Sequence, residues 1–166
     1  MRPTIDLYFL KMATLVSTRS TCLRRTVGCV LVNARGHVLA TGYNGVAAGL
    51  PHCNERIDRS STVNGTINVM LGADNEYPNA CRGAHEPSGQ NLNGCDAIHA
   101  EQNALLQCRD AWAISTAYVT VSPCLVCTKL LMNTACQRIA FLEEYAHNDK
   151  AKDLWTSQAG RSWIKA

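Results

Sequence analysis

AYVTVSPCLVCTKLLMNTACQRIAFLEE, residues 117–144, predicts a strand, a helix and a second strand in succession. Both outer segments are short apolar runs with the length and composition of buried strands. Pro123 stands at the beginning of the middle segment, a position that helices tolerate. Strands that alternate with helices in this way are typical of α/β proteins with a mostly parallel sheet.

The rest of the chain continues this alternation. VGCVLVNARGHVLATGYN, residues 27–44, predicts a hairpin of two short strands around a turn at Ala34-Arg35-Gly36. We also expect helices over residues 4–18, 98–112 and 149–157 and a short strand near 162–165. These patterns together predict an α/β sandwich around a mostly parallel sheet that opens with a hairpin.

A loop-rich segment at about residues 51–96 interrupts the pattern. It is rich in Gly, Asn, Pro and Ser, and such long segments are uncommon inside a compact domain unless they are functional or pinned. Cys53, Cys81, His85 and Cys95 lie within it and could pin it. The length of 166 residues favours a single domain over residues 1–166, with this segment as an insertion.

Composition and charge argue against several classes of protein. The formal net charge is +3 without a basic run, which disfavours a nucleic-acid-binding protein but is compatible with a small anionic substrate. The run IDLYFLKMATLV is broken by Asp6 and Lys11, is too short to span a membrane and lacks the layout of a signal peptide. We therefore expect a cytoplasmic protein without membrane contacts. In that compartment, the nine cysteines indicate metal ligands before disulfides.

The clearest chemical signal is a set of metal-binding residues at two expected helix starts. The spacing of Cys124 and Cys127 places both sulfurs on one side of a first helical turn, where thiolates are favoured. His99 would be a third ligand, and this donor set leaves the fourth position of a catalytic zinc open for water. Glu101 would then take a proton from that water and pass it to a substrate.

The order of these residues matches a general signature. H-x-E followed by P-C-x-x-C marks zinc-dependent deaminases, in which the glutamate is the general acid and base. The chain has HAE at residues 99–101 and PCLVC at residues 123–127. A histidine alone would favour a buried core residue, and a CxxC alone would also fit a redox motif. Both halves in this order favour the deaminase.

Longer stretches resemble the deoxycytidylate (dCMP) deaminases of the bacterial and phage type. They lie within residues 5–145 and are TRSTCLRRTVGCVLV, LATGYNG, HCNE, PSGQNLNGCDAIHAEQNA and SPCLVC. The resemblance implies the cytidine deaminase-like fold, a three-layer α/β/α sandwich around a five-stranded sheet. It also implies hydrolysis of dCMP to dUMP and ammonia, which feeds dTMP synthesis, by attack of an activated water on C4 of the pyrimidine.

The resemblance implies roles for individual residues. His99, Cys124 and Cys127 match the zinc ligands, and Glu101 matches the group that protonates N3 and the departing amine. Asn44 matches the residue that holds the sugar, and Ala100 and Tyr145 match substrate contacts. For the phosphate, the candidates are Arg24, Arg25 and Lys150, and an arginine pairs well with phosphate. We select Arg25, and a solvated surface charge is the alternative for each of the three.

A second group of cysteines is implied to bind a structural zinc as a closed site. Its members are Cys22, Cys53, Cys81 and Cys95, with His85 or His52 as an alternative ligand. Ordinary buried cysteine is the competing interpretation, and we expect it for Cys29, Cys108 and Cys136. The segment between Cys53 and Cys81 is longer than is usual in the resembled family.

The resemblance further implies a homo-oligomer, a hexamer, that is activated by dCTP with Mg²⁺ and inhibited by dTTP. GYNGVAAG and the residues around Gly28 are the candidates for an effector site. Deaminases of cytidine, of a 5-substituted dCMP or of tRNA adenosine remain as alternatives with the same chemistry. A zinc-binding scaffold without catalysis is the alternative from a different class.

Overall fold

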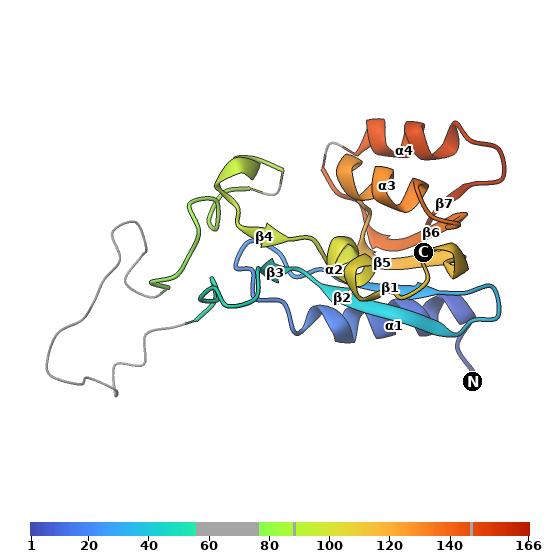
Figure 1. The fold of residues 1–166 in the computed structure, drawn as a ribbon, viewed down its shortest axis with the longest axis horizontal. Helices are drawn as coiled ribbons and strands as arrows, with labels where there is room; N and C mark the ends of the chain where they lie inside the picture. Colours follow the sequence, from blue (N-terminus) through green and yellow to red (C-terminus); the bar gives the residue numbers. More distant parts are fainter. Residues whose placement is uncertain (56–76, 88, 147) are drawn as a thin grey trace, which may run out of the picture.

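The computed structural model describes residues 1–55, 77–87, 89–146 and 148–166, so part of the expected insertion at 51–96 lies outside the described residues. The central feature is a five-stranded sheet in the order β2-β1-β5-β6-β7 (Figure 1). Its strands are β1 (Gly28–Val32), β2 (Val38–Tyr43), β5 (Thr116–Val121), β6 (Arg138–Glu143) and β7 (Ser162–Lys165). The expected hairpin and all three expected later strands are therefore present.

The direction of the strands follows from their connections. β1 is antiparallel to both of its neighbours, β2 and β5, whereas β5, β6 and β7 are parallel. In this sheet, β1 thus runs against the other four strands. Every residue of β1 and β5 is buried, because these strands are covered on both faces, and this explains their continuous apolar sequences.

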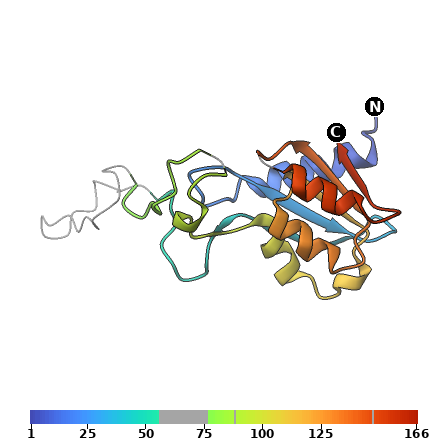
Figure 2. The same cartoon turned by 90° about the horizontal axis from the view of Figure 1, so that it is seen from above.

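Helices cover both faces of the sheet, as the α/β/α prediction requires (Figures 1 and 2). On one face, Phe9, Leu10 and Ala13 of α1 (Ile5–Ser17) pack against Val30 and Tyr118. The opposite face is covered by α2 (Ala100–Gln107), α3 (Leu125–Met132) and α4 (Asp149–Thr156). Their buried residues form one core with that face of the sheet, and they include Ala100, Ala104, Leu131 and Trp155.

Two helices differ from their expected bounds. The helix expected over residues 98–112 ends at Gln107, and a 3-10 turn, η2 (Ala111–Ala113), follows it. This second segment has its own cap, because the Asp110 carboxylate accepts a hydrogen bond from the Trp112 amide at 3.0 Å. The helix expected from Pro123 begins at Leu125, with Cys124 as its N-cap residue.

A small ladder outside the main sheet brings two parts of the chain together. β3 (Gly45–Val46) pairs with β4 (Ala97–Ile98) in antiparallel orientation, and a 3-10 turn, η1 (Leu92–Gly94), precedes β4. Because Gly45 is opposite Ile98, the ladder places the neighbouring residues Asn44 and His99 in the same region. It thereby joins the end of the first hairpin to the start of α2.

Gly42 in β2 permits close packing of α2 on the sheet. A Cβ at this position would lie 2.3 Å from both the Ala100 carbonyl oxygen and the Ala104 amide nitrogen. Any larger residue would therefore push away the helix whose first turn contains Glu101.

Among the described residues, no helix has both the length and the apolar character needed to cross a membrane. The single domain over residues 1–166 stays a prediction.

Candidate active site

Two helix starts define the site. His99 is the N-cap residue of α2, and its backbone amide donates to the side-chain oxygen of Gln102 at 2.9 Å. Cys124 is the N-cap residue of α3, and its carbonyl oxygen accepts from the Thr128 amide at 2.9 Å. Gln102 at the third helical position is a residue type that favours a helix start, so the local sequence fixes where α2 begins.

The side chains of His99, Cys124 and Cys127 converge. Nδ1 of His99 lies 3.5 Å from Sγ of Cys124 and 3.4 Å from Sγ of Cys127. Within the described chain, these three residues form the group whose donor atoms all lie within 4.8 Å of one another. Zinc bond lengths to sulfur and imidazole nitrogen in a tetrahedral site require an N-to-S separation of about 3.6 Å. The donor set and its spacing therefore fit a zinc ion.

The two thiols are electrostatically coupled. A hydrogen bond from Cys127 and the neighbouring His99 lower the pKa of Cys124 to about 4, against the opposing effect of burial. The same hydrogen bond and burial raise the pKa of Cys127. The Cys124 thiol therefore loses its proton readily, whereas the Cys127 thiol keeps its proton. A cation between the sulfurs would take the place of the Cys127 proton.

Glu101 lies beside this donor set in the first turn of α2. Its side chain is buried, with the residue 4% exposed, and burial raises its pKa to about 7. The Cys127 thiol forms a hydrogen bond that favours the ionised carboxylate. A buried carboxyl group whose pKa is near neutrality is suited to accept and to donate a proton. The sequence-based role of Glu101 is compatible with this environment.

A cavity of about 450 Å³ opens onto these residues. Its size falls within the range of small-molecule sites. Cys127 is fully buried and is not among the residues that line this cavity. The predicted site residues that line the cavity are Arg25, Asn44, His99, Ala100, Glu101, Cys124 and Tyr145, together with Cys22 and Cys95 of the second cysteine group. Residues distant in the sequence are therefore collected around one space.

Asn44 is held rigidly at the cavity. Its Oδ1 accepts from the Ser20 hydroxyl at 2.7 Å and from the Val27 amide at 2.8 Å. Its Nδ2 donates to the Arg25 carbonyl oxygen at 2.7 Å. An amide nitrogen has two protons, so one N–H of Asn44 remains for a ligand.

The two consecutive arginines have different partners. Arg25 forms an ion pair with Glu143 at the end of β6, and its side chain is 27% exposed. Nε of Arg24 donates to the Gly83 carbonyl oxygen at 2.8 Å and so ties down the loop that precedes β4. Lys150, the third candidate, is exposed in α4 and is not among the residues that line the cavity. Arg24 and Arg25 both line the cavity, and the assignment of Arg25 to a phosphate stays a prediction.

Ser122 and its partner Asn148 were not predicted from the sequence, and of the two Ser122 lines the cavity. Ser122, between β5 and Pro123, lines the cavity and accepts hydrogen bonds from the Tyr145 amide and from Nδ2 of Asn148, each at 2.7 Å. Asn148 directly precedes α4, and in the sequence it is indistinguishable from an ordinary N-cap residue.

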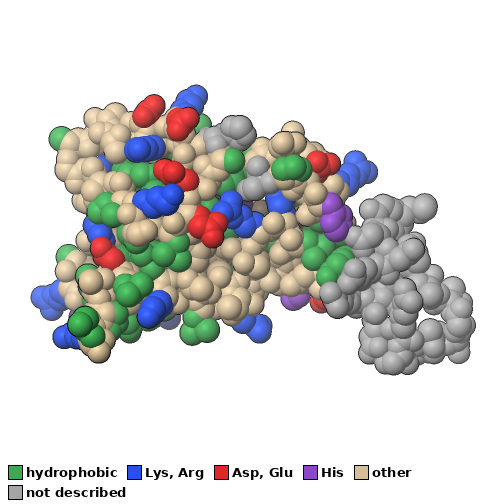
Figure 3. All heavy atoms as spheres, turned by 180° about the vertical axis from the view of Figure 1, so that it is seen from behind, with side chains coloured by type: hydrophobic (Ala, Val, Ile, Leu, Met, Phe, Trp, Pro, Cys, Tyr) green, Lys and Arg blue, Asp and Glu red, His purple; other side chains and the backbone are tan. Residues whose placement is uncertain are grey.

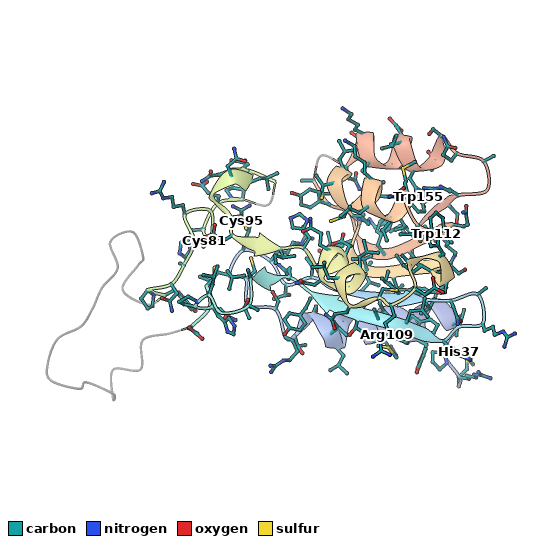
Figure 4. The ribbon with its side chains drawn as sticks, in the orientation of Figure 1. His37, Cys81, Cys95, Arg109, Trp112 and Trp155 are labelled. Carbon is teal, nitrogen blue, oxygen red and sulfur yellow. The ribbon has the colours of Figure 1, made fainter. Side chains whose placement is uncertain are left out.

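The second cysteine group is close together but does not form one compact donor set. Cys95 chiefly lowers the pKa of the Cys22 thiol, to about 6, and burial with a contribution from Cys81 raises the pKa of the Cys53 thiol, so each pair lies close together. Cys81 and Cys95 lie in the loop-rich part of the molecule, away from the sheet (Figure 4). The alternative ligands differ in their surroundings: His85 is exposed, and Nδ1 of the exposed His52 lies 3.4 Å from Glu55.

The fold and the arrangement of one histidine, two cysteines and one buried glutamate define the class of zinc-dependent nucleotide and nucleoside deaminases. The family model for the cytidine and deoxycytidylate deaminase zinc-binding region matches residues 3–143. This chain belongs to that family, and the resemblance noted in the sequence is confirmed.

Individual relatives support the same family. The deoxycytidylate deaminase of Mycobacterium phage D29 is 37% identical over 145 residues, which cover 86% of this chain and 98% of the relative. The deoxycytidylate deaminase of Saccharomyces cerevisiae is 32% identical over 153 residues, which cover 91% of this chain. The chain spans 41% of that protein and 38% of the Schizosaccharomyces pombe relative, about two fifths of their length.

Solved structures confirm the predicted fold. The apo crystal structure of dCMP deaminase from the cyanophage S-TIM5 covers 100% of this chain with a TM-score of 0.65 and 23% identity. The structure of the same phage enzyme in complex with dCMP and dUMP matches with a TM-score of 0.63 and 24% identity. At this level of identity, the likeness concerns the arrangement of helices and strands.

Proposed function

We propose that this chain is a zinc-dependent hydrolase that converts dCMP and water to dUMP and ammonia. The observation that supports this most strongly is the convergence of His99, Cys124 and Cys127 beside the buried Glu101, at the wall of a cavity of nucleotide size. The relatives named deoxycytidylate deaminase support dCMP as the substrate.

In this proposal, His99, Cys124 and Cys127 hold the metal. A bound Zn²⁺ supplies Lewis acidity that lowers the pKa of a water molecule from about 15.7 toward about 7. Glu101 accepts a proton from the water and delivers it to N3 of the pyrimidine. The carboxylate then takes the remaining proton from the hydroxyl group on C4 and passes it to the amino group, which leaves as ammonia, so its burial next to the donor set serves both transfers.

The remaining cavity residues bind and orient the nucleotide. The free N–H of Asn44 donates to the sugar, and the three hydrogen bonds that fix its amide hold this donor in place. Arg25 binds the phosphate when the substrate displaces Glu143 from its ion pair. Tyr145 and the backbone of Ala100 form the wall against which the base lies.

A substrate panel tests this function. Purified protein is assayed by loss of cytosine absorbance with dCMP, deoxycytidine, dCTP and 5-methyl-dCMP. We expect turnover of dCMP, with a kcat/KM at least about tenfold higher than for deoxycytidine, because a charge-assisted phosphate contact contributes roughly 1.5–3 kcal/mol. Equal turnover of deoxycytidine and dCMP would instead favour a nucleoside deaminase. Preference for 5-methyl-dCMP would favour a 5-substituted nucleotide.

The alternatives of another kind have weaker support. On the face in Figure 3, basic and acidic side chains are mixed, without one gathered basic surface of the kind that a tRNA enzyme uses. A zinc-binding scaffold has no need for a buried carboxyl group beside the metal donors, which Glu101 provides. Zinc binding without turnover of any nucleotide would nevertheless establish the scaffold.

The second zinc remains part of the proposal. Two pairs of neighbouring thiols support it, Cys22 with Cys95 and Cys53 with Cys81, and one zinc ion would draw all four sulfurs together. A zinc there would fasten both ends of the long insertion to the segment that follows α1.

A cytoplasmic location is supported by the free state of all nine cysteines, which suits a reducing compartment.

Assembly and regulation complete the proposal. Large apolar side chains are exposed on α2, η2 and α3, including Leu106 at 79% and Trp112 at 73%, and they offer area for contacts in a homo-oligomer. The hexameric state, activation by dCTP with Mg²⁺ and inhibition by dTTP have support from the family resemblance only. Residues 1–166 are proposed to act as a single domain.

A further inference from the structure

Asn148 occupies a helix-cap position without capping its helix. An asparagine directly before a helix ordinarily accepts a hydrogen bond from one of the first backbone amides, and its backbone is extended. Asn148 has φ −95° and ψ 1°, and its side chain makes no capping hydrogen bond to α4. Instead, its Nδ2 donates to the Ser122 hydroxyl oxygen at 2.7 Å, in a buried position.

Ser122 joins three segments at the wall of the cavity. Its hydroxyl oxygen accepts from Asn148 and also from the backbone amide of Tyr145 at 2.7 Å. Its own amide donates to the Glu143 carbonyl oxygen at 2.8 Å. With the residue only 3% exposed, water cannot readily replace these partners. The end of β5, the residues after β6 and the start of α4 are thus linked through one hydroxyl group.

We propose that Asn148, acting through Ser122, is a positioning residue that fixes Tyr145 at the substrate cavity. A hydroxyl oxygen that accepts two directional bonds has a defined orientation, and loss of either donor frees it to rotate. Beyond Asn148, α4 is anchored by the fully buried Ala151 and Trp155. The Ser122 contact therefore supplies the defined link between this anchored helix and Tyr145. The kinetic consequence of this proposal rests on the proposed deaminase function.

A matched control separates positioning from simple stabilisation of α4. Ser157 lies at the other end of this helix, where its hydroxyl donates to the Leu154 carbonyl oxygen at 2.7 Å. Ser157→Ala removes one hydrogen bond from α4 but leaves Ser122 untouched. If Asn148 only stabilises the helix, Asn148→Ala and Ser157→Ala affect the cavity in proportion to the stability that each removes, the exposed Ser157 less than the buried Asn148.

The test combines amide hydrogen exchange at single-residue resolution by NMR with kinetics on dCMP. We expect Asn148→Ala and Ser122→Ala to accelerate exchange of the Tyr145 amide by about tenfold or more, the size of effect that loss of a buried hydrogen bond produces. We also expect about a tenfold higher KM for dCMP, with kcat changed less and zinc content unchanged. Ser157→Ala should change neither the exchange nor the KM.

Tyr145→Ala provides a further comparison. In that background, Asn148→Ala should raise the KM by less than about twofold, because residues that act through one another have non-additive effects. An unchanged Tyr145 exchange rate in Ser122→Ala and Asn148→Ala, or the same KM increase with Tyr145 already removed, would overturn the proposal. If Asn148→Ala does not fold, the Tyr145 exchange rate and the KM of Ser122→Ala decide whether the proposal holds. If the wild type turns over no nucleotide, the deaminase proposal fails, and the exchange rates still decide the positioning proposal.

Discussion

Nδ1 of His99 lies 3.4 Å from Sγ of Cys127, although 28 positions of sequence separate the two residues. Two elements lie between them in the sequence: α2, which packs on the sheet, and β5, the middle strand of the sheet, which leads to the start of α3. The metal-binding set is therefore a product of the fold and not of one local motif. Mutations in this set and around it yield distinct predictions.

Glu101→Gln removes the proton carrier but keeps the shape of the side chain. We expect a roughly 10²- to 10⁴-fold loss of kcat on dCMP, the usual contribution of a general acid or base. Zinc content should remain that of the wild type, because the three donor side chains are unchanged. The measurement is steady-state kinetics with metal analysis of the same sample. Near-normal turnover would contradict the role of Glu101.

Cys127→Ala should abolish metal binding at the site. Cys136→Ala is the matched control, since both cysteines are fully buried and the change in side-chain volume is the same. We expect the Cys127 variant alone to lose the zinc of this site, one of the two proposed, together with activity, because a site with two remaining ligands holds zinc weakly. A chelator should likewise inactivate the wild type, and added zinc should restore it. Equal zinc content in both variants would exclude this donor set.

Arg25→Gln should weaken recognition of the phosphate. We expect the KM for dCMP to rise roughly tenfold or more, with little change for deoxycytidine, because the lost charge-assisted contact involves the phosphate alone. Glu143→Gln should act in the opposite direction and lower the KM for dCMP, since it removes the competing carboxylate. Kinetics of both variants on both substrates check this. A similar loss on deoxycytidine would assign Arg25 a structural role.

A cluster on the opposite face predicts the dependence of stability on pH. Asp6 in α1 receives hydrogen bonds from Tyr118 at 2.9 Å and from Arg138 at 2.6 and 2.8 Å, and the Arg138 contact chiefly lowers its pKa. Because the folded state favours the ionised carboxylate, the contact stabilises the fold above about pH 4, and this is lost as the pH falls through the lowered pKa. Because the side chains of Arg138 and Asp6 are partly exposed to water, we expect this ion pair to contribute about 1 kcal/mol to the free energy of unfolding.

Asp6→Asn should therefore lower the Tm by about 2–4 °C at pH 7, and the difference should shrink toward pH 3. Asp153→Asn, at an exposed position in α4, serves as the control and should change the Tm little. Thermal unfolding across this pH range measures both variants. A difference that grows as the pH falls would contradict the ion-pair account.

The sequence predicts those parts of the site that depend on short-range geometry. One turn of a helix brings Cys124 and Cys127 together, and the short spacing of His99 and Glu101 keeps both at the first turn of α2. The alternation of apolar runs similarly predicts the layers of the fold, since β1 and β5 are buried throughout. These features require no knowledge of distant contacts.

Other features depend on contacts between distant residues, which a single sequence does not encode locally. Arg24 and Arg25 are neighbours of the same type, but their partners lie 59 and 118 positions away. The β3–β4 ladder pairs two residues with two, which is too short for a periodic pattern. Asn148 has the sequence position of a helix cap, and only packing against Ser122 reveals its different role.

The most direct test of the central claim is to quantify zinc, dUMP and ammonia from one sample of purified wild-type protein incubated with dCMP. The proposed function predicts bound zinc and equal amounts of dUMP and ammonia, with both products lost when a chelator removes the metal. Bound zinc without formation of dUMP or ammonia would contradict the claim and would leave the arrangement of His99, Cys124, Cys127 and Glu101 as a metal site without deaminase activity.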